Sequence, residues 1–367
     1  MIPKIDLERV YNRLSELKST GKKIIGVFPH TLIPDELIYA AGAIPLKLAL
    51  GGDDHLTAIG TEYLTQATCP FARGCIGYFD QSFPIYTLID TFIGGNFCNG
   101  DLTASEMIIK FFKIPWLRIT FPTTAQQFSL KFLKQEYLKL KESLESLMGI
   151  QILPEDLFAA IEKYNKLRAS LLNLNLLMNE PTSLMGEDLH NLVHLLFLLG
   201  PDEALQIIAN LKIETDTSSG NRIPILLSGS GIALGDDLIH VIEDLNARVV
   251  INDSWTGIYQ YNEKITYAPE EDPIDALTTH YLLKNESARM VPNVRRIPRV
   301  LKLVKEFNIK GVINHILKFC DPYIAHRIKF KTDLQEADIP VLELERDYST
   351  SLEQLKTRIG AFLEMIA

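Results

Sequence analysis

The sequence predicts an α/β protein with two parallel-sheet domains and a helical segment between them. Residues 23–121 and 222–365 alternate short apolar strands with amphipathic helices, the pattern of a parallel sheet. Leucines recur at helical spacing almost throughout residues 126–211. A chain of 367 residues is long enough for two or three domains. We therefore expect an N-terminal α/β domain at 1–125, a helical segment at 126–217 and a C-terminal α/β domain at 218–367.

The N-terminal part begins with a helix and then follows a βαβ pattern. Charges separate apolar residues at helical spacing over residues 5–19, which predicts an amphipathic helix that ends at Thr20 and Gly21. Asp35 and Glu36 open the next helix, where acidic residues favour the positive end of the helix dipole. The predicted elements are strands at 23–28, 44–50 and 116–121, a helix at 35–42, and a helix running into a strand at 85–93.

The C-terminal part repeats this pattern. A glycine-rich turn, Gly229 to Gly235, joins a strand to a helix but lacks the dinucleotide-binding spacing. Two interpretations stay open: a tight turn, or a helix N-terminus that holds a phosphate or thioester oxygen. The predicted strands are at 222–228, 247–251, 341–345 and in the apolar run from 311. The predicted helices are at 237–245, 275–283, 324–336 and 351–365, with one more that follows the arginine-rich segment 289–299 and ends at 307.

Composition excludes several function classes. The net charge is −9 with no basic run, so we expect no nucleic-acid partner. No apolar run approaches a membrane span, and the charged N-terminus has no signal-peptide core, so we expect a cytoplasmic protein without a membrane partner. No phosphate-binding P-loop motif occurs. In the cytoplasm thiols stay reduced, so the cysteines are expected to be buried, catalytic or metal-binding.

Four cysteines are the first candidates for a functional site. Cys98 and Cys320 each follow an apolar run and precede turn residues, Cys69 precedes a proline, and Cys75 follows a glycine. Loops at the carboxyl ends of strands are where α/β sheets form clefts. No C-x-x-C motif is present, which argues against a zinc knuckle or a thioredoxin site. The remaining alternatives are inert buried thiols, or ligands of an iron–sulfur cluster or zinc.

Two further groups are candidates with structural alternatives. His30 and Thr31 lie in the loop after the first predicted strand, where either could meet a substrate, although a loop histidine is more commonly structural. A group of arginines could hold an anionic substrate such as a CoA phosphate, or could form a solvated face. These arginines are Arg289, Arg295, Arg296 and Arg299.

Several segments together resemble the 2-hydroxyacyl-CoA dehydratase / benzoyl-CoA reductase family. Residues 34–45 resemble its P-x-E-L-I-x-A-A-G-x-x-P motif. Cys69-Pro-Phe-Ala-Arg, Cys98 and Lys318-Phe-Cys320-Asp-Pro-Tyr resemble the segments of its three cluster cysteines. Residues 339–345 and 354–364 are similar to its C-terminal signature. The resemblance extends from near residue 21 to residue 367.

The resemblance implies a particular fold and cofactor. It implies two flavodoxin-like (Rossmann-like) domains with a helical insertion, and a [4Fe–4S] cluster between them. By this resemblance Cys69, Cys98 and Cys320 are the cluster ligands, and one iron is left open. Cys75 is an additional candidate, similar to an arrangement in double-cubane relatives. Ser254 and Ser287 stand where many relatives have cysteine, so a double-cubane cluster is the less expected alternative.

The resemblance also implies a chemistry. An oxygen-sensitive lyase of this family adds one electron to an acyl-CoA thioester, and the resulting ketyl radical expels the α-hydroxyl group. The open iron is a Lewis acid for a substrate oxygen. A separate ATP-hydrolysing activator supplies the electron, which agrees with the missing P-loop, and a related second subunit or a homodimer is expected. The alternatives are a double-cubane-type reductase of small molecules and a non-catalytic electron-relay or partner subunit.

Overall fold

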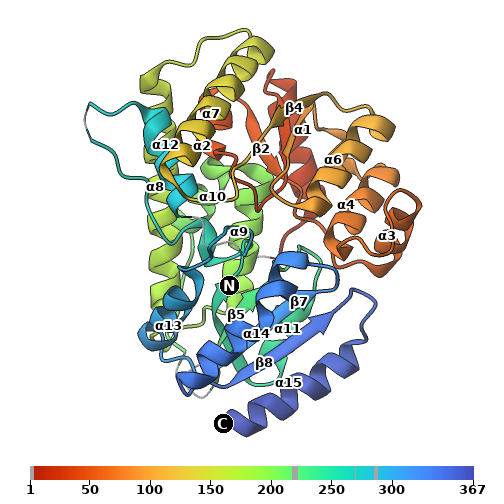
Figure 1. Cartoon of the computed structure of the whole chain (residues 1–367), viewed down its shortest axis with the longest axis vertical. Helices are drawn as coiled ribbons and strands as arrows, with labels where there is room; N and C mark the ends of the chain where they lie inside the picture. Colours follow the sequence, from red (N-terminus) through yellow and green to blue (C-terminus); the bar gives the residue numbers. More distant parts are fainter. Residues whose placement is uncertain (1–3, 217–221, 269, 285–287) are drawn as a thin grey trace.

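The computed structural model describes residues 4–216, 222–268, 270–284 and 288–367. It contains two four-stranded parallel sheets, with strand orders β2-β1-β3-β4 and β6-β5-β7-β8, which confirms the predicted α/β class (Figure 1). The strands of the first sheet are β1 (Ile24–Val27), β2 (Ile44–Lys47), β3 (Thr91–Gly95) and β4 (Trp116–Ile119). Those of the second sheet are β5 (Ile223–Gly229), β6 (Ala247–Asp253), β7 (Gly311–Leu317) and β8 (Val341–Arg346).

Helices cover both sheets and fill the segment between them. Those of the N-terminal part are α1 (Leu7–Ser19), α2 (Asp35–Ala40), α3 (Asp54–Ile59), α4 (Pro70–Asp80), α5 (Pro84–Thr87) and α6 (Asn99–Phe112). The helical segment consists of α7 (Gln127–Met148), α8 (Pro154–Leu177), α9 (Gly186–Leu199) and α10 (Pro201–Ala209). Those of the C-terminal part are α11 (Leu238–Asp244), α12 (Pro273–Leu283), α13 (Arg296–Glu306), α14 (Asp321–Glu336) and α15 (Leu352–Ile366). Short 3₁₀ turns are η1 (Gly60–Glu62) and η3 (Ile258–Gln260).

The two sheets have the same topology. In each, the first strand along the chain lies inside the sheet, with the second strand on one side and the third on the other. In such doubly wound sheets the order of the strands reverses next to the first strand, and a crevice opens there at the carboxyl ends. The crevices of this protein therefore lie after β1 and β3 in the first sheet, and after β5 and β7 in the second.

Burial explains why some strands appear in the sequence as continuous apolar runs. Every residue of β1, β3 and β7 is buried, because helices cover both faces of a parallel sheet. Such strands appear as continuous apolar runs rather than as alternating patterns. The edge strands β4 and β8 expose Arg118 and Glu345, and charges at an edge discourage pairing with another chain.

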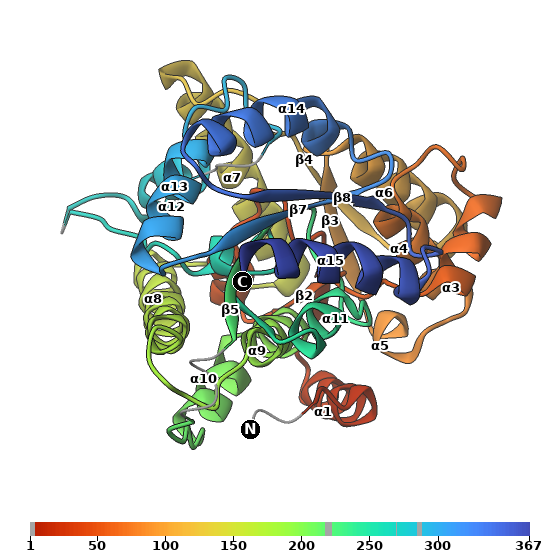
Figure 2. The same cartoon turned by 90° about the horizontal axis from the view of Figure 1, so that it is seen from below.

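The helical segment is packed into both halves of the molecule. Helix α8 contacts α2, and α9 contacts both β2 of the first sheet and β6 of the second. Figures 1 and 2 show α9 in the middle of the molecule, near β2 and β5. The largest apolar cluster accordingly joins Phe28 after β1, Leu192 of α9 and Val312 of β7. The domain boundaries near residues 125 and 217 remain predictions, and residues 217–221 at the second boundary lie outside the described residues.

A short backbone bridge joins the loops at the carboxyl ends of the two sheets. Leu50, after β2, forms an isolated parallel bridge with Leu234, after β5. The Gly51 amide donates to the Leu234 carbonyl at 3.1 Å, and the Leu234 amide donates to the Ala49 carbonyl at 2.9 Å. The bridge holds these two loops against each other.

One predicted helix begins earlier than its sequence indicates. We expect a helix from residue 324, but α14 begins at Asp321. Pro322 lies in its first turn, where the missing amide proton of proline costs nothing because that position has no intrahelical acceptor. As a consequence Cys320 is the N-cap of α14, directly at the helix end.

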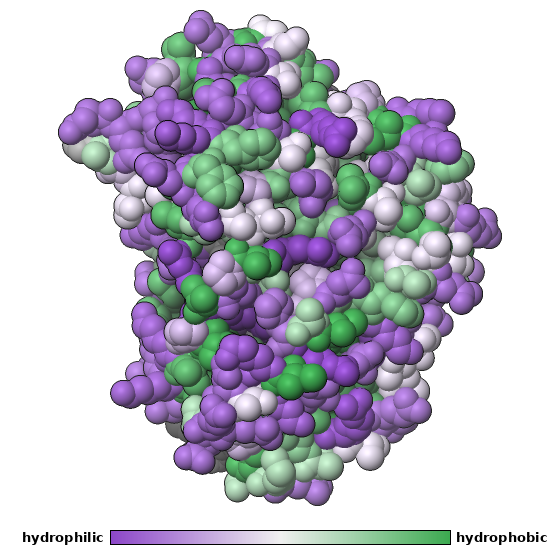
Figure 3. Space-filling model, viewed as in Figure 1, coloured by the Kyte–Doolittle hydropathy of each residue, from purple (hydrophilic) through white to green (hydrophobic). Residues whose placement is uncertain are grey.

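The surface of the described residues is mixed in character. On the face shown in Figure 3, hydrophobic residues occur in small groups among hydrophilic ones. None of the described helices combines the length and the apolar character needed to cross a bilayer.

The packing of α4 against α3 gives a first testable prediction. A Cβ atom at Gly77 of α4 would lie 2.0 Å from the carbonyl oxygen of Leu56, whereas a Cβ at Gly360 of α15 meets nothing within 4 Å. Gly77→Ala should lower the free energy of unfolding by about 1–3 kcal/mol through overpacking. The matched control Gly360→Ala should raise it by up to about 1 kcal/mol, since alanine favours a helix. Chemical denaturation followed by circular dichroism measures both, and equal midpoints for the two variants would contradict the prediction.

Candidate functional site

The crevices of the two sheets open into one shared pocket. Its walls come from the loops after β1, β3, β5, β6 and β7 and from the start of α4, and it encloses about 810 Å³ including its open mouth. Residues from both halves meet there, for example His30 after β1, Cys98 after β3 and Ser230 after β5. The pocket thus occupies the position where doubly wound sheets bind ligands.

Three cysteines line this pocket, and each is the N-cap of a helix. Cys69 precedes α4, Cys98 precedes α6 and Cys320 precedes α14. None of the three side chains caps its own helix by a hydrogen bond. The first backbone N–H groups of a helix have no intrahelical acceptor, and the helix dipole is positive there. Three helix ends that favour negative charge therefore converge on three thiols.

Local sequence features bring the cysteines together. Gly100, in the first turn of α6, faces the start of α4, where a Cβ at position 100 would lie 3.4 Å from the Cβ of Ala72 and 3.7 Å from that of Cys69. These distances correspond to ordinary van der Waals contact, so the two helix ends lie side by side. In the C-terminal half, Phe319 takes a left-handed conformation with φ of 62°, which turns the chain between β7 and Cys320.

The ionisation of the thiols shows that they share one environment. Burial raises the pKa of Cys69 well above its ordinary value, and negative charge on Cys320 and Cys98 raises it further. Burial also raises the pKa of Cys320 to about 11, against the opposing hydrogen bond from Ser230. Three neighbouring thiolates repel one another, so they need a cation that displaces their protons. The arrangement fits a metal centre with thiolate ligands.

The spacing of the ligands favours a centre larger than one ion. Two sulfur ligands of a single zinc ion lie at most about 4.6 Å apart, since each Zn–S bond is about 2.3 Å. Within the described residues, only His30, Cys98 and Asp101 form a group of three ligand atoms within 4.8 Å of one another. The three cysteines are more widely spaced, which suits a polynuclear cluster better than a single ion.

Cys75 lies apart from the other three cysteines. It is buried in α4 outside the pocket, and its thiol approaches the carbonyl oxygens of Leu48 at 3.7 Å and Leu50 at 3.8 Å. Burial raises the pKa of Cys75 well above its ordinary value. Its surroundings are those of an inert core thiol.

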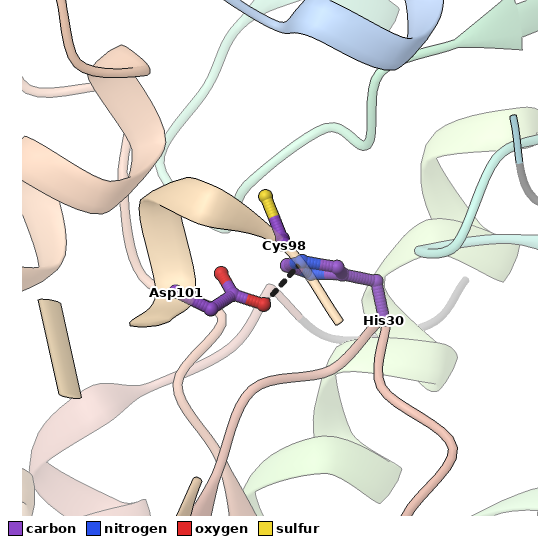
Figure 4. A group of neighbouring side chains, drawn as sticks. All are labelled: His30, Cys98 and Asp101. Atoms are coloured by element: carbon purple, nitrogen blue, oxygen red, sulfur yellow. Dashed lines mark ion pairs between the residues drawn. The ribbon is translucent and has the colours of Figure 1, made fainter. Parts of the chain in front are cut away.

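An ion pair stands beside Cys98. The imidazole Nε2 of His30 lies 2.6 Å from Asp101 Oδ2, and both side chains are largely buried (Figure 4). Burial disfavours a charge on His30, but the Asp101 carboxylate outweighs it and raises the pKa of His30 to about 10. Thr31 lies elsewhere: its hydroxyl donates to the Phe28 carbonyl at 3.0 Å and lines a separate polar cavity. Of these two candidates, the pocket contains His30.

Three arginines line the pocket. Arg289 Nη2 donates to Cys98 Sγ at 3.4 Å. Arg299 pairs with Asp253 at 2.6 Å, and Arg296 donates to the hydroxyl of Ser228 at 3.1 Å. These three arginines line the pocket, whereas the exposed Arg295 donates to the Leu283 carbonyl outside it. Three of the four candidate arginines are therefore held in the pocket wall by defined contacts and do not form a solvated face.

The glycine-rich turn after β5 is filled by protein atoms. A Cβ at Gly229 would lie 2.0 Å from the His315 carbonyl oxygen, and one at Gly231 would lie 2.2 Å from the Trp255 ring. Gly235 similarly faces the carbonyl of Gly51. Gly229 and Gly231 allow close packing within the C-terminal half and Gly235 allows close approach of the two halves, which supports the interpretation as a tight turn.

Sequence reasoning missed several pocket residues. Trp255, after β6, packs against both His30 and Phe71 with ring centroids 5.0 Å apart in each case. Asp101 carried a detectable signal, because it lies three residues after Cys98 and therefore one helical turn away. Ser230 follows the first strand of its sheet, as His30 does, so the repeated topology could have indicated it. Ser254 also lines the pocket, whereas Ser287 lies outside the described residues.

Comparison with known proteins agrees with this architecture. The sequence profile of the family "2-hydroxyglutaryl-CoA dehydratase, D-component" matches residues 30–366. A candidate dehydratase subunit of Escherichia coli (strain K12), YjiM, is 27% identical over 98% of this chain and 99% of its own length.

Two further relatives have similar coverage. The (R)-phenyllactyl-CoA dehydratase beta subunit of Clostridium sporogenes is 26% identical over 96% of this chain and 94% of its own. The (R)-2-hydroxyglutaryl-CoA dehydratase subunit beta of Acidaminococcus fermentans is 25% identical over 96% and 95%, respectively. Full-length coverage in each case means that the similarity extends to both halves of the pocket.

The buried pair of His30 and Asp101 predicts a pH dependence of stability in iron-free protein. The pKa of His30 is about 10 when folded and about 6.5 when unfolded, so its stabilising contribution is complete below about pH 6.5 and disappears as pH rises through 10. The stability difference between wild type and His30→Gln should therefore shrink over this interval. Denaturant titrations at several pH values measure it, with Asp101→Asn as a second variant that should flatten the profile similarly. Parallel profiles for wild type and both variants would refute the assignment.

Proposed function

Because the chain belongs to the 2-hydroxyglutaryl-CoA dehydratase D-component family, we propose that it is the iron–sulfur subunit of an oxygen-sensitive 2-hydroxyacyl-CoA dehydratase-like enzyme. The observation that carries this proposal is the convergence of Cys69, Cys98 and Cys320 on one pocket, each at a helix N-terminus. Thiolates are the ligands that iron–sulfur clusters use, and helix ends stabilise their negative charge.

The proposed cofactor is one [4Fe–4S] cluster held by these three cysteines. With three thiolates for four irons, one iron lacks a protein thiolate. When bound, the cluster supplies single electrons at low potential and a Lewis-acidic iron for one-electron, ketyl-radical dehydration of the substrate.

A double-cubane cluster is the weaker alternative. It needs more thiolates than the pocket offers, because the fourth cysteine of the chain, Cys75, contacts the carbonyls after β2 instead. Ser254, at a position where cysteine occurs in relatives, donates to Asn252 Oδ1 at 2.7 Å and is held in the wall of the pocket. A reductase of the double-cubane type therefore has less support from this chain.

Residues of the chain itself have proposed roles in binding and proton transfer. An α-hydroxyl leaves as water only when it gains a proton, and we assign that proton to the imidazole of His30, which Asp101 keeps charged. Arg296 and Arg299 place positive charge in the pocket wall, where a thioester substrate with anionic groups would lie. Trp255 and Phe71 exclude water from the pocket. Thr31 supports the loop that carries His30.

The proposed assembly contains more than this chain. Two of the relatives are beta subunits by name, so we propose a related second subunit, or a homodimer, together with an ATP-dependent activator in the cytoplasm. The same observation favours a second candidate function, an electron-relay subunit whose cluster serves a partner that binds the acyl-CoA.

Iron content tests the ligand assignment. Protein purified without oxygen should contain about four irons and four sulfides per chain. Cys69→Ala, Cys98→Ala and Cys320→Ala should each lose most of this iron, because each removes a ligand. Cys75→Ala is the matched control and should keep it.

Each outcome of the iron measurement has a distinct meaning. About eight irons per chain, reduced by Cys75→Ala, would favour the double-cubane alternative. Absence of iron from wild-type protein, with all variants unchanged, would refute the cluster.

Activity separates the catalytic from the relay function. With activator, ATP and a second subunit present, we expect dehydration of a 2-hydroxyacyl-CoA, and His30→Gln should lower kcat by about 10²–10⁴-fold if His30 supplies the proton. Electron paramagnetic resonance of the reduced cluster serves as the control for cluster content. Unchanged kcat in His30→Gln with cluster intact would place substrate on the partner and favour the relay function.

A further inference from the structure

We propose that Arg289 is a positioning residue that raises the reduction potential of the cluster site through a direct N–H···S hydrogen bond to Cys98. This inference rests on the proposed function, since it concerns the same three-cysteine site. It goes beyond that function by naming the side chain that determines how readily the site accepts an electron.

The contact joins distant parts of the chain. Arg289 lies between α12 and α13, and its Nη2 atom donates to Cys98 Sγ, the N-cap sulfur of α6, at 3.4 Å. The guanidinium also lies in the field of Cys320, so its charge acts on two of the three thiols. An arginine stays charged at every pH that the protein tolerates. Its effect therefore persists regardless of the protonation of neighbouring groups.

The three thiols have different second partners. Burial raises the pKa of Cys69 and outweighs the backbone N–H groups of Phe71 and Ala72, which lower it. Burial likewise raises the pKa of Cys320 and outweighs the hydroxyl of Ser230, which lowers it. Of the three, Cys98 receives a hydrogen bond from a cationic side chain. The nearby His30 also acts on Cys98, but it forms an ion pair with Asp101, so the negative carboxylate partly cancels the electrostatic effect of the imidazolium on Cys98. The charge of His30 is thus shared with Asp101, whereas Arg289 donates directly to the sulfur.

The physical effect has a definite sign. Addition of one electron increases the negative charge on the ligand sulfurs, and both the N–H···S bond and the guanidinium charge stabilise that charge more strongly in the reduced form. No bond forms or breaks, and one electron from an external donor is consumed. Loss of the arginine should therefore make reduction harder and move the midpoint potential to a more negative value.

The experiment compares charge and geometry at one position. Arg289→Gln removes the charge, whereas Arg289→Lys keeps the charge and loses the planar fork. Arg295→Gln is the matched control, because it removes the same charge from the same segment at an exposed site outside the pocket. Each protein is purified without oxygen and titrated with dithionite while electron paramagnetic resonance records the reduced cluster, and iron is counted separately.

The expected result is a graded shift. Arg289→Gln should lower the equilibrium constant for reduction by about tenfold, which for one electron corresponds to about 59 mV. Arg289→Lys should shift less, and Arg295→Gln should match wild type. If Arg289→Gln does not hold its cluster, the midpoint potential of Arg289→Lys is compared with that of wild type. A more negative potential in Arg289→Lys supports the inference, and an unchanged one overturns it.

The failures can be told apart. If wild type holds about four irons and both Arg289 variants reduce at the wild-type potential, this inference is overturned and the proposed function stands. An equal shift in Arg295→Gln would also overturn it, because the effect would then be one of overall charge. If wild type holds no iron, both the proposed function and the inference fail.

Discussion

The convergence of three helix N-termini on one pocket is the constraint on which the site depends. Cys69, Cys98 and Cys320 occupy equivalent positions at the ends of α4, α6 and α14. Burial raises the pKa of the Cys69 and Cys320 thiols, whereas the positive ends of the three helices favour negative charge beside them. In the proposed function a metal centre would displace the protons of these thiols, and the helix ends would stabilise the resulting thiolates.

The three helix ends stay together only if the two halves of the molecule keep a fixed relative position. Helix α9 packs on both sheets, and the backbone bridge between Leu50 and Leu234 joins the loops beside the pocket. Glycines at the contact, such as Gly52 and Gly235, leave room for backbone against backbone, where a Cβ would lie 2.7–2.8 Å from the facing atoms. The helical segment and these close contacts therefore act as the frame of the site, although they contain none of its ligands.

Charge is distributed unevenly around the pocket. One side holds Cys98 between Arg289 and the His30–Asp101 pair, and the other holds Arg299 against Asp253. Each of the two aspartates is paired with a cation, so the cationic side chains exceed the anionic ones. In the proposed function, this surplus of positive charge would offset the negative charge of thiolate ligands and of an acyl-CoA substrate. The same surplus would make electron uptake at the site easier, so that substrate binding and redox behaviour would depend on one electrostatic environment.

The amino-acid sequence by itself determined the α/β class, most strands and helices, and the position of Cys98 and Cys320 after buried strands, because periodicity and turn residues act locally. The early start of α14 escaped it, since Pro322 reads as a helix break as well as a first-turn residue. Only the tertiary structure decided that Cys75 turns into the core while Cys69, six residues earlier, faces the pocket, because the packing of a helix selects the face it presents. The contacts of His30 with Asp101 and of Arg289 with Cys98 join residues that are far apart in the chain. No local pattern encodes them, because His30 and Asp101 meet only when β1 and β3 pair in one sheet, and Arg289 reaches Cys98 from the other half of the chain.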